Sequence, residues 1–213
     1  MAGNASVLED GSVLSRLDRG LEKIEIKLAL VSGMAVFGLM LLAVVSVGGR
    51  NLINRPVPGY VDWIELAMPL IAFLGVSYTQ RLGGHIRMDI LIGKLRGRIL
   101  WMAELVSVLV MLLLVLFLIW GSWAHFARSF DWAAPLWSRD STIDIRMPIW
   151  PAKLLAPIAF SVLALRLLLQ VWAYCRAIVT GAVNPIAVPL PLSAAELAAE
   201  EALHVSSLDK EAR

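Results

Sequence analysis

Three ionisable residues, Glu65, Lys153 and Arg166, stand within long apolar stretches of the chain. A charge inside a membrane is costly, so each residue marks a candidate structural or functional contact. Glu65 and Lys153 each lie about 7 Å inside one end of their stretch. Glu65 could therefore pair with Lys153, or with Arg55 just outside the stretch, and so offset the cost of burial. A contact between Glu65 and a partner subunit, or a proton or cation site at Glu65, are the alternatives.

Arg166 lies deeper in its stretch, 15 residues beyond Pro151. That separation corresponds to about 22 Å of helix, which leaves about 8 Å of hydrocarbon beyond it. Its long side chain can snorkel to the headgroups or contact another helix. A direct role in binding a substrate is the alternative.

The sequence lacks the common motifs for catalysis and for metal or nucleotide binding. It contains no H-E-x-x-H, G-x-S-x-G or P-loop motif, and Cys175 is its only cysteine. His85 and His125 are predicted on opposite faces of the membrane, where they cannot share one haem. We therefore expect no catalytic residue, no metal site and no cofactor on this chain, and we predict that it is not an enzyme.

The elements that carry these residues are four apolar stretches, at about 28–49, 60–79, 105–123 and 151–172. The first has no charged residue among its 22 positions, and it reaches about 33 Å as a helix, more than the ~30 Å of a bilayer core. The whole chain is 59% hydrophobic and only 17% charged, against about 25% charged in soluble domains. We predict an all-α membrane protein with four transmembrane helices in residues 28–183.

The positive-inside rule predicts the orientation of these helices. Ten Lys and Arg residues flank one side and six flank the other, which places the N-terminal segment 1–27 and the C-terminus in the cytoplasm. Indole rings favour the headgroup level, and six tryptophans fall near predicted span ends. These interfacial aromatic residues are Trp63, Trp101, Trp120, Trp123, Trp150 and Trp172.

Residues 82–98, between the second and third spans, are predicted to form an interfacial amphipathic helix. Apolar residues recur there at roughly helical spacing with basic residues between them, a pattern typical of helices that lie against anionic headgroups. A solvated basic loop that only fixes the topology is the alternative. The candidate headgroup-binding residues are His85, Arg87, Asp89, Lys94, Arg96 and Arg98.

Two further segments lie outside the spans. The aromatic loop 126–149 either docks an external partner or lies on the bilayer surface. Residues 184–213 read as a cytoplasmic linker with several prolines followed by a short helical tail, since Ser193 and Glu196 match a capping box.

Several short stretches form a distinctive succession along the chain. They are Asp-Trp-Ile-Glu65-Leu, Phe-Leu-Gly75, the stretch from Gly84-His-Ile-Arg to Leu91, Ile145-Arg-Met-Pro-Ile-Trp150, Ala156-Pro-Ile158 and Leu165-Arg166. This succession resembles the small membrane subunit of TRAP (tripartite ATP-independent periplasmic) transporters, the DctQ-like family. The resemblance covers roughly residues 25–175, and its most specific piece is Gly84-His-Ile followed by Asp89.

The resemblance implies a scaffold subunit that packs against a separate large permease subunit in the bacterial inner membrane. The large subunit would carry the substrate and sodium sites and import an organic acid by symport, and a periplasmic binding protein would deliver that acid. The remaining expected contacts are membrane lipids, and the formal charge of +2 does not suggest nucleic acid. The alternatives are a self-contained multidrug-type proton-coupled transporter and the membrane anchor of a quinone-linked oxidoreductase.

Overall fold

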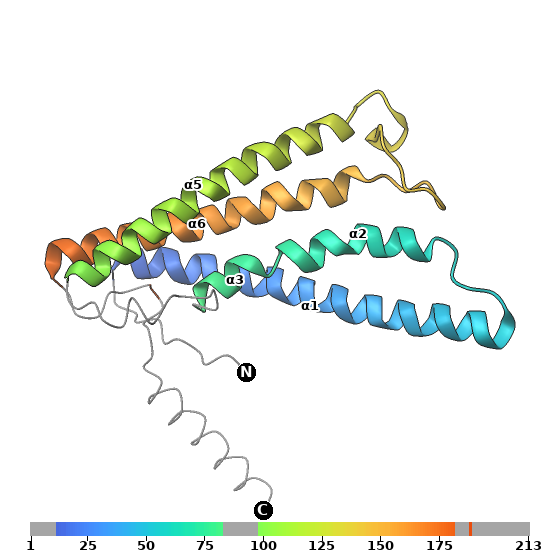
Figure 1. The fold of residues 1–213 in the computed structure, drawn as a ribbon, viewed down its shortest axis with the longest axis horizontal. Helices are drawn as coiled ribbons and strands as arrows, with labels where there is room; N and C mark the ends of the chain where they lie inside the picture. Colours follow the sequence, from blue (N-terminus) through green and yellow to red (C-terminus); the bar gives the residue numbers. More distant parts are fainter. Residues whose placement is uncertain (1–11, 83–97, 182–187, 189–213) are drawn as a thin grey trace, which may run out of the picture.

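Long helices make up most of the computed structural model, which describes residues 12–82, 98–181 and 188. The helices are α1 (Val13–Ile53), α2 (Tyr60–Phe73), α3 (Val76–Arg81), α5 (Arg98–Ser129), a short 3₁₀ turn η1 (Pro135–Trp137) and α6 (Trp150–Thr180) (Figure 1). Helix α1, the pair α2–α3, α5 and α6 are each long and apolar enough to cross a membrane. The predicted all-α fold with four transmembrane helices is confirmed.

Helix α1 is much longer than the span predicted at 28–49. Its 41 residues extend about 60 Å, twice the thickness of a bilayer core. The helix begins after Ser12, whose side chain accepts a hydrogen bond from the Ser15 backbone N–H, and it ends at Asn54 in the left-handed conformation. Residues 13–27, predicted to precede the span, therefore continue the same helix.

The second span is divided into α2 and α3. Gly59 precedes α2 with a φ of 65°, and a Cβ atom at this glycine would lie 2.7 Å from the Ile145 side chain. Only glycine therefore fits where the loop after α5 crosses the start of α2. Pro69 lies inside α2 and cannot donate a backbone hydrogen bond, and the helix is interrupted at Leu74 and Gly75 before α3 begins.

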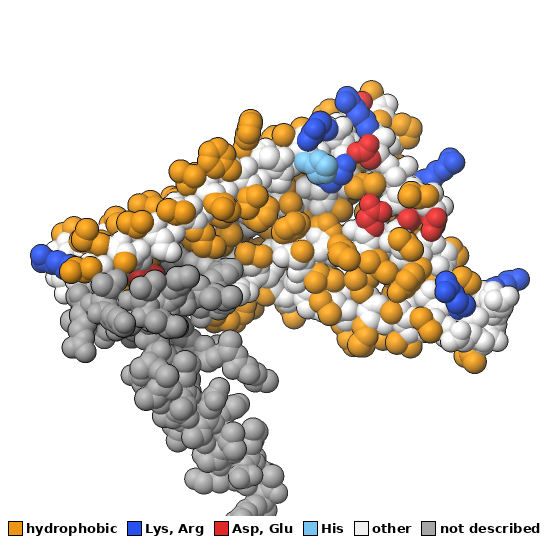
Figure 2. All heavy atoms as spheres, viewed as in Figure 1, with side chains coloured by type: hydrophobic (Ala, Val, Ile, Leu, Met, Phe, Trp, Pro, Cys, Tyr) orange, Lys and Arg blue, Asp and Glu red, His pale blue; other side chains and the backbone are white. Residues whose placement is uncertain are grey.

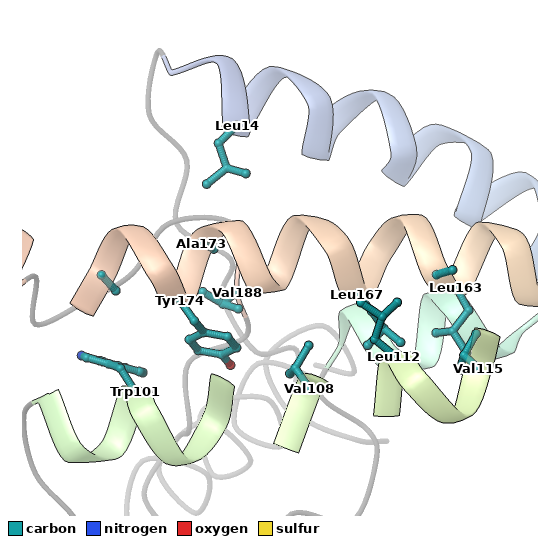
Figure 3. Packing of buried hydrophobic residues seen from close by; sticks show 12 residues of the cluster. Leu14, Trp101, Val108, Leu112, Val115, Leu163, Leu167, Ala173, Tyr174 and Val188 are labelled. Carbon is teal, nitrogen blue, oxygen red and sulfur yellow. The ribbon is translucent and has the colours of Figure 1, made fainter. Parts of the chain in front are cut away.

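The hydrophobic core lies mainly between α5 and α6. In Figure 3, Leu112 and Val115 of α5 face Leu163 and Leu167 of α6, and Leu167 is fully buried. Trp101 was predicted to be interfacial, but it is only 6% exposed and stacks on Tyr174 with a centroid separation of 6.1 Å. Helices α5 and α6 continue beyond the predicted spans and bury the indole between them, so Trp101 packs within the protein instead of on its surface.

The helices form two antiparallel pairs, α1 with α2–α3 and α5 with α6, and α6 contacts every other helix. The pairs lie close together where α1 starts and α3 ends, and they separate toward the loop between α5 and α6 (Figure 1). We call the first the charged end, defined by Asp18, Arg81 and Arg166, and the second the loop end, defined by residues 130–149.

Hydrophobic side chains cover the helices between these ends (Figure 2). None of the most apolar window of α1 is buried against the rest of the protein, whereas 39% of that of α6 is buried. The predicted amphipathic helix lies outside the described residues except for Leu82 and Arg98, and the predicted tail lies outside them except for Val188. Arg98 is exposed at the first residue of α5.

Candidate functional site: a buried charged cluster and a folded loop

Arg166 of α6 is the centre of a cluster of charged side chains at the charged end. Its Nε and Nη2 atoms donate to the two carboxylate oxygens of Glu25 at 2.8 and 2.6 Å, and its Nη1 atom donates to Asp18. Arg166 and Asp18 are 1% exposed, and Glu25 is fully buried. The guanidinium group therefore binds two carboxylates of α1 away from water.

Arg81 of α3 completes the cluster from a third helix. It donates to the second carboxylate oxygen of Asp18 at 2.9 Å and forms an ion pair with the partly exposed Glu22 at 3.3 Å. Ser77, one turn earlier, donates to Glu25 at 2.6 Å. Each buried carboxylate thus has donors from both α3 and α6.

An uncharged pair lies next to the ionic contacts and extends this polar layer. The Gln80 side-chain amide donates to the Gln170 side-chain carbonyl at 2.9 Å, and both residues are buried. Gln170 lies one turn after Arg166 on α6, and Gln80 directly precedes Arg81 on α3. The ionic and amide contacts together fix the positions of α1, α3 and α6 relative to one another.

The spacing of the acidic residues explains why one face of α1 supplies the whole negative side of the cluster. Asp18, Glu22 and Glu25 are separated by four and three residues, so they share one face of the helix. This regularity was available in the sequence, as was the lone arginine inside the fourth span. The sequence pattern alone does not connect the two, because Arg166 lies more than 140 residues from Asp18 and Glu25.

Of the two contacts predicted for Arg166, the structure shows the contact with another helix. Snorkelling to the headgroups is excluded because the side chain is 1% exposed and both ends of its guanidinium group are bound to α1.

Lys153 binds at the loop end, and the predicted pair with Glu65 does not form. The Lys153 ammonium group donates to Asp140 at 2.7 Å and to the Ser129 hydroxyl. The hydrogen bond and the charge of Lys153, together with the Ser129 hydroxyl, lower the pKa of Asp140 from its ordinary value. The prediction failed because the loop before α6 folds back and brings Asp140 to the start of α6.

Asp62 connects this folded loop to α2. Its carboxylate accepts hydrogen bonds from the backbone N–H groups of Asp144 and Ile145 at 3.0 and 2.8 Å, and the residue is 2% exposed. From the sequence, Glu65, three residues after Asp62, was the acidic residue of this span expected to form a contact. The structure shows that Asp62 is the acidic residue that joins the second span to the loop.

Aromatic rings hold the loop against the ends of α5 and α6. The indole N–H of Trp150 donates to the Leu136 carbonyl at 3.0 Å. Its ring lies 5.4 Å from that of Phe130 and 6.4 Å from that of Trp137, measured between centroids. Trp150, predicted to be interfacial, is thus partly buried in an aromatic cluster that gives the loop a defined structure.

The same loop exposes large apolar side chains. Leu136 and Trp137 both adopt the left-handed conformation, with φ of 53° and 56°, which is uncommon for residues with a side chain. Leu136 is 69% exposed and Trp132 is 76% exposed. The other tryptophans predicted to be interfacial, Trp63, Trp120, Trp123 and Trp172, are also exposed, at 43, 74, 53 and 47%.

Glu65 differs from the other acidic residues of the spans. It is exposed on α2, and the structure shows no hydrogen bond or ion pair from its carboxylate to any described residue. The predicted headgroup-binding residues His85, Arg87, Asp89, Lys94 and Arg96 lie outside the described residues.

The chemistry of the cluster is that of a structural contact. In residues 12–82 and 98–181, no group of three or more His, Cys, Asp or Glu side chains is arranged to hold a metal ion. The buried carboxylates Asp18 and Glu25 are bound in ion pairs to Arg81 and Arg166. A guanidinium group bound to two carboxylates offers neither a nucleophile nor a free base.

Comparison with known proteins adds one finding. The sequence model of the family "Tripartite ATP-independent periplasmic transporters, DctQ component" matches residues 39–177, which is more than half of the chain. No curated protein matches the chain.

Proposed function

Because the chain belongs to the DctQ-component family of tripartite ATP-independent periplasmic transporters, we propose that it is the static scaffold subunit of such a transporter. In this role it packs against a large permease subunit and holds no transport site of its own. The single observation that carries the proposal is the buried charged cluster, in which Arg166 and Arg81 are bound to carboxylates of α1. Such a network suits a rigid support, because moving one helix would break several buried ion pairs at once.

The transport reaction itself belongs to the partners in this proposal. A periplasmic binding protein delivers an organic acid, and the large subunit imports it with sodium ions that bind to that subunit. The chain lies in the bacterial inner membrane with both termini in the cytoplasm, in accordance with the distribution of its Lys and Arg residues. Membership of this family also favours a transporter component over a proton-coupled drug exporter or the anchor of an oxidoreductase.

Co-purification and reconstitution test the proposal. We expect an affinity-tagged chain to retain the co-expressed large permease subunit through detergent extraction. Vesicles that contain both subunits should take up the organic acid when a sodium gradient and the binding protein are present. Uptake by vesicles that contain this chain alone would contradict the scaffold role, as would failure of the tagged chain to retain the large subunit.

The orientation has a separate test. The chain has one cysteine, Cys175, so a Cys175→Ser background allows single cysteines to be placed at will. In intact cells, a membrane-impermeant maleimide should label Ser141→Cys at the loop end and should not label Asp89→Cys. The reverse pattern would show that the termini are on the periplasmic side.

A further inference from the structure

One face of α2 is left uncovered by the rest of the described structure. Val61 and Met68 are 64 and 60% exposed, and Glu65 and Ala72 are exposed as well. These residues are separated by four, three and four positions, so they form a single stripe along the helix. We call this stripe the α2 face.

The other sides of α2 are already in contact with this chain. The Ile71 carbonyl accepts a hydrogen bond from Ser32 of α1 at 3.2 Å. The ring of Phe73 packs edge-on against Phe160 of α6, with centroids 5.2 Å apart. The α2 face is therefore the side of the second span that points away from both neighbouring helices.

Glu65 lies within the part of the second span that must cross the hydrocarbon. Asp62 is held by backbone N–H groups of the loop, and Arg81 is held by Asp18 at the other end. These two polar anchors are 19 residues apart, or about 28 Å of helix, which is close to the ~30 Å of a bilayer core. Glu65, about 4.5 Å inward from Asp62, lies between the anchors.

A carboxylate at this depth in the membrane requires a hydrogen-bond donor, and the backbone carbonyl of the same residue requires one as well. Pro69 has no N–H group, so the backbone carbonyl of Glu65 lacks the donor that residue i+4 normally supplies. The buried residues Arg81 and Arg166 cannot act as this donor, because both are bound to a carboxylate of α1. Lys153, the expected partner, is bound to Asp140.

We propose that the α2 face docks onto a transmembrane helix of the large permease subunit, and that this helix presents an arginine or lysine to Glu65. The inference rests on the proposed function and specifies which surface of this chain meets the partner. A basic side chain would satisfy the carboxylate, and an arginine could in addition reach the free carbonyl of the same residue. The apolar positions Val61 and Met68 would pack on either side of that contact.

Neither lipid nor a second copy of this chain joined through the α2 face offers a basic side chain to Glu65. Lipid tails offer no hydrogen-bond donor, so Glu65 and its carbonyl would remain unsatisfied. Between Val61 and Thr79 the second span contains no basic residue, so two copies joined symmetrically through this face would bring two carboxylates together. The charge on the α2 face therefore favours a different protein with a basic residue.

Photo-cross-linking provides the first test, with the large permease subunit co-expressed. A benzoylphenylalanine probe at Met68 should form an adduct with the large subunit, whereas a probe at Leu113 on α5 should not. The two positions form a matched pair, because both are apolar and they are 60 and 58% exposed. An adduct with a second copy of this chain, no adduct from position 68, or an equal yield from both positions would overturn the inference.

Charge substitutions provide the second test. Glu65→Gln should reduce the amount of large subunit that co-purifies by about tenfold, and Glu65→Lys should abolish co-purification. The melting temperature of the isolated chain should not fall for Glu65→Gln, since the Glu65 carboxylate makes no hydrogen bond or ion pair with any described residue of the chain. Full retention of the large subunit by Glu65→Lys would refute the α2 face as the docking surface while leaving the proposed function intact. Failure of the wild-type chain to retain the large subunit would refute both.

Discussion

Both ends of this molecule contain an ion pair between a basic and an acidic side chain, but the two pairs differ in their exposure to water. At the charged end, Arg166 and Glu25 form an ion pair in which both side chains are at most 1% exposed. At the loop end, Lys153 and Asp140 form a pair whose side chains are 19 and 48% exposed. Water screens the second pair and not the first, so loss of one partner should have very different consequences at the two ends.

The difference also separates two ways of joining helices. The charged end joins α1, α3 and α6 through side chains that are buried among the helices themselves. The loop end joins α2 to the α5–α6 pair through backbone N–H groups of a connecting loop that bind Asp62. We infer that the charged end sets the positions of the helices and that the loop end limits how far the two pairs separate.

The largest loss of stability is expected for Arg166→Met. The change leaves Glu25 and Asp18 buried without their shared cation, so the free energy of unfolding should fall by about 3–5 kcal/mol. Thermal unfolding of the purified protein in detergent measures the change. Arg50→Met, at the exposed last turn of α1, is the control and should stay within about 0.5 kcal/mol of wild type.

A double variant tests the interpretation of that loss. Adding Glu25→Met to Arg166→Met removes one orphaned carboxylate, so part of the lost stability should return. If the single variant were as stable as wild type, the buried cluster would contribute nothing to the position of the helices, and the contrast between the two ends would be lost.

A smaller, local effect is expected for Asp62→Ala. The substitution removes the acceptor for the N–H groups of Asp144 and Ile145, so their amide hydrogens should exchange on the order of tenfold faster. Hydrogen exchange followed by mass spectrometry of loop peptides measures this. Peptides from α1 that contain Glu25 should exchange at the wild-type rate, and faster exchange there as well would show that the two ends are not independent.

Acid should weaken the loop end through Asp140. Lys153 holds the pKa of Asp140 below its ordinary value of 3.8, so the folded state binds this proton less readily than the unfolded state. The stabilisation is therefore fully present above pH 3.8 and is lost as the pH falls through the lowered pKa. The melting temperatures of wild type and Asp140→Asn should differ at pH 6, and the difference should shrink as the pH is lowered below 3.8. A difference that stays constant over this range would contradict the assignment.

The smallest effect is expected for Arg139→Gln. Arg139 pairs with Asp131 at 3.0 Å, but its side chain is 59% exposed. A backbone N–H group of Ala133, rather than Arg139, is the main cause of the lowered pKa of Asp131. The melting temperature should change by no more than about 1 °C, and a larger drop would mean that this exposed pair behaves like the buried ones.

The sequence was sufficient to predict the four spans because hydrophobic length is a local property. The stretch 28–49 is long enough by itself to require a membrane. The helix ends were not predictable in the same way. Residues 13–27 are helical and pack beside α6 because their carboxylates meet Arg166 and Arg81, and hydropathy alone does not register such contacts.

The pairing of charged residues was the harder part to predict. Glu65 and Lys153 lie at similar depths, so depth alone favoured a pair between them. Whether they meet depends on the path of the loop before α6, which places Asp140 against Lys153. Trp101 illustrates the same limit, because an indole near a span end can face lipid or, as here, stack on a ring of the next helix.

The separation of the cluster residues along the chain has a consequence for biosynthesis. Asp18 and Glu25 leave the ribosome early, whereas Arg166 follows more than 140 residues later. Until the fourth helix is made, the first helix must keep part of its negative charge in contact with water or with the inserting machinery. The final register of the first helix is therefore set only after translation has passed Arg166, so truncation before that residue should leave an inserted but misaligned chain open to proteolysis.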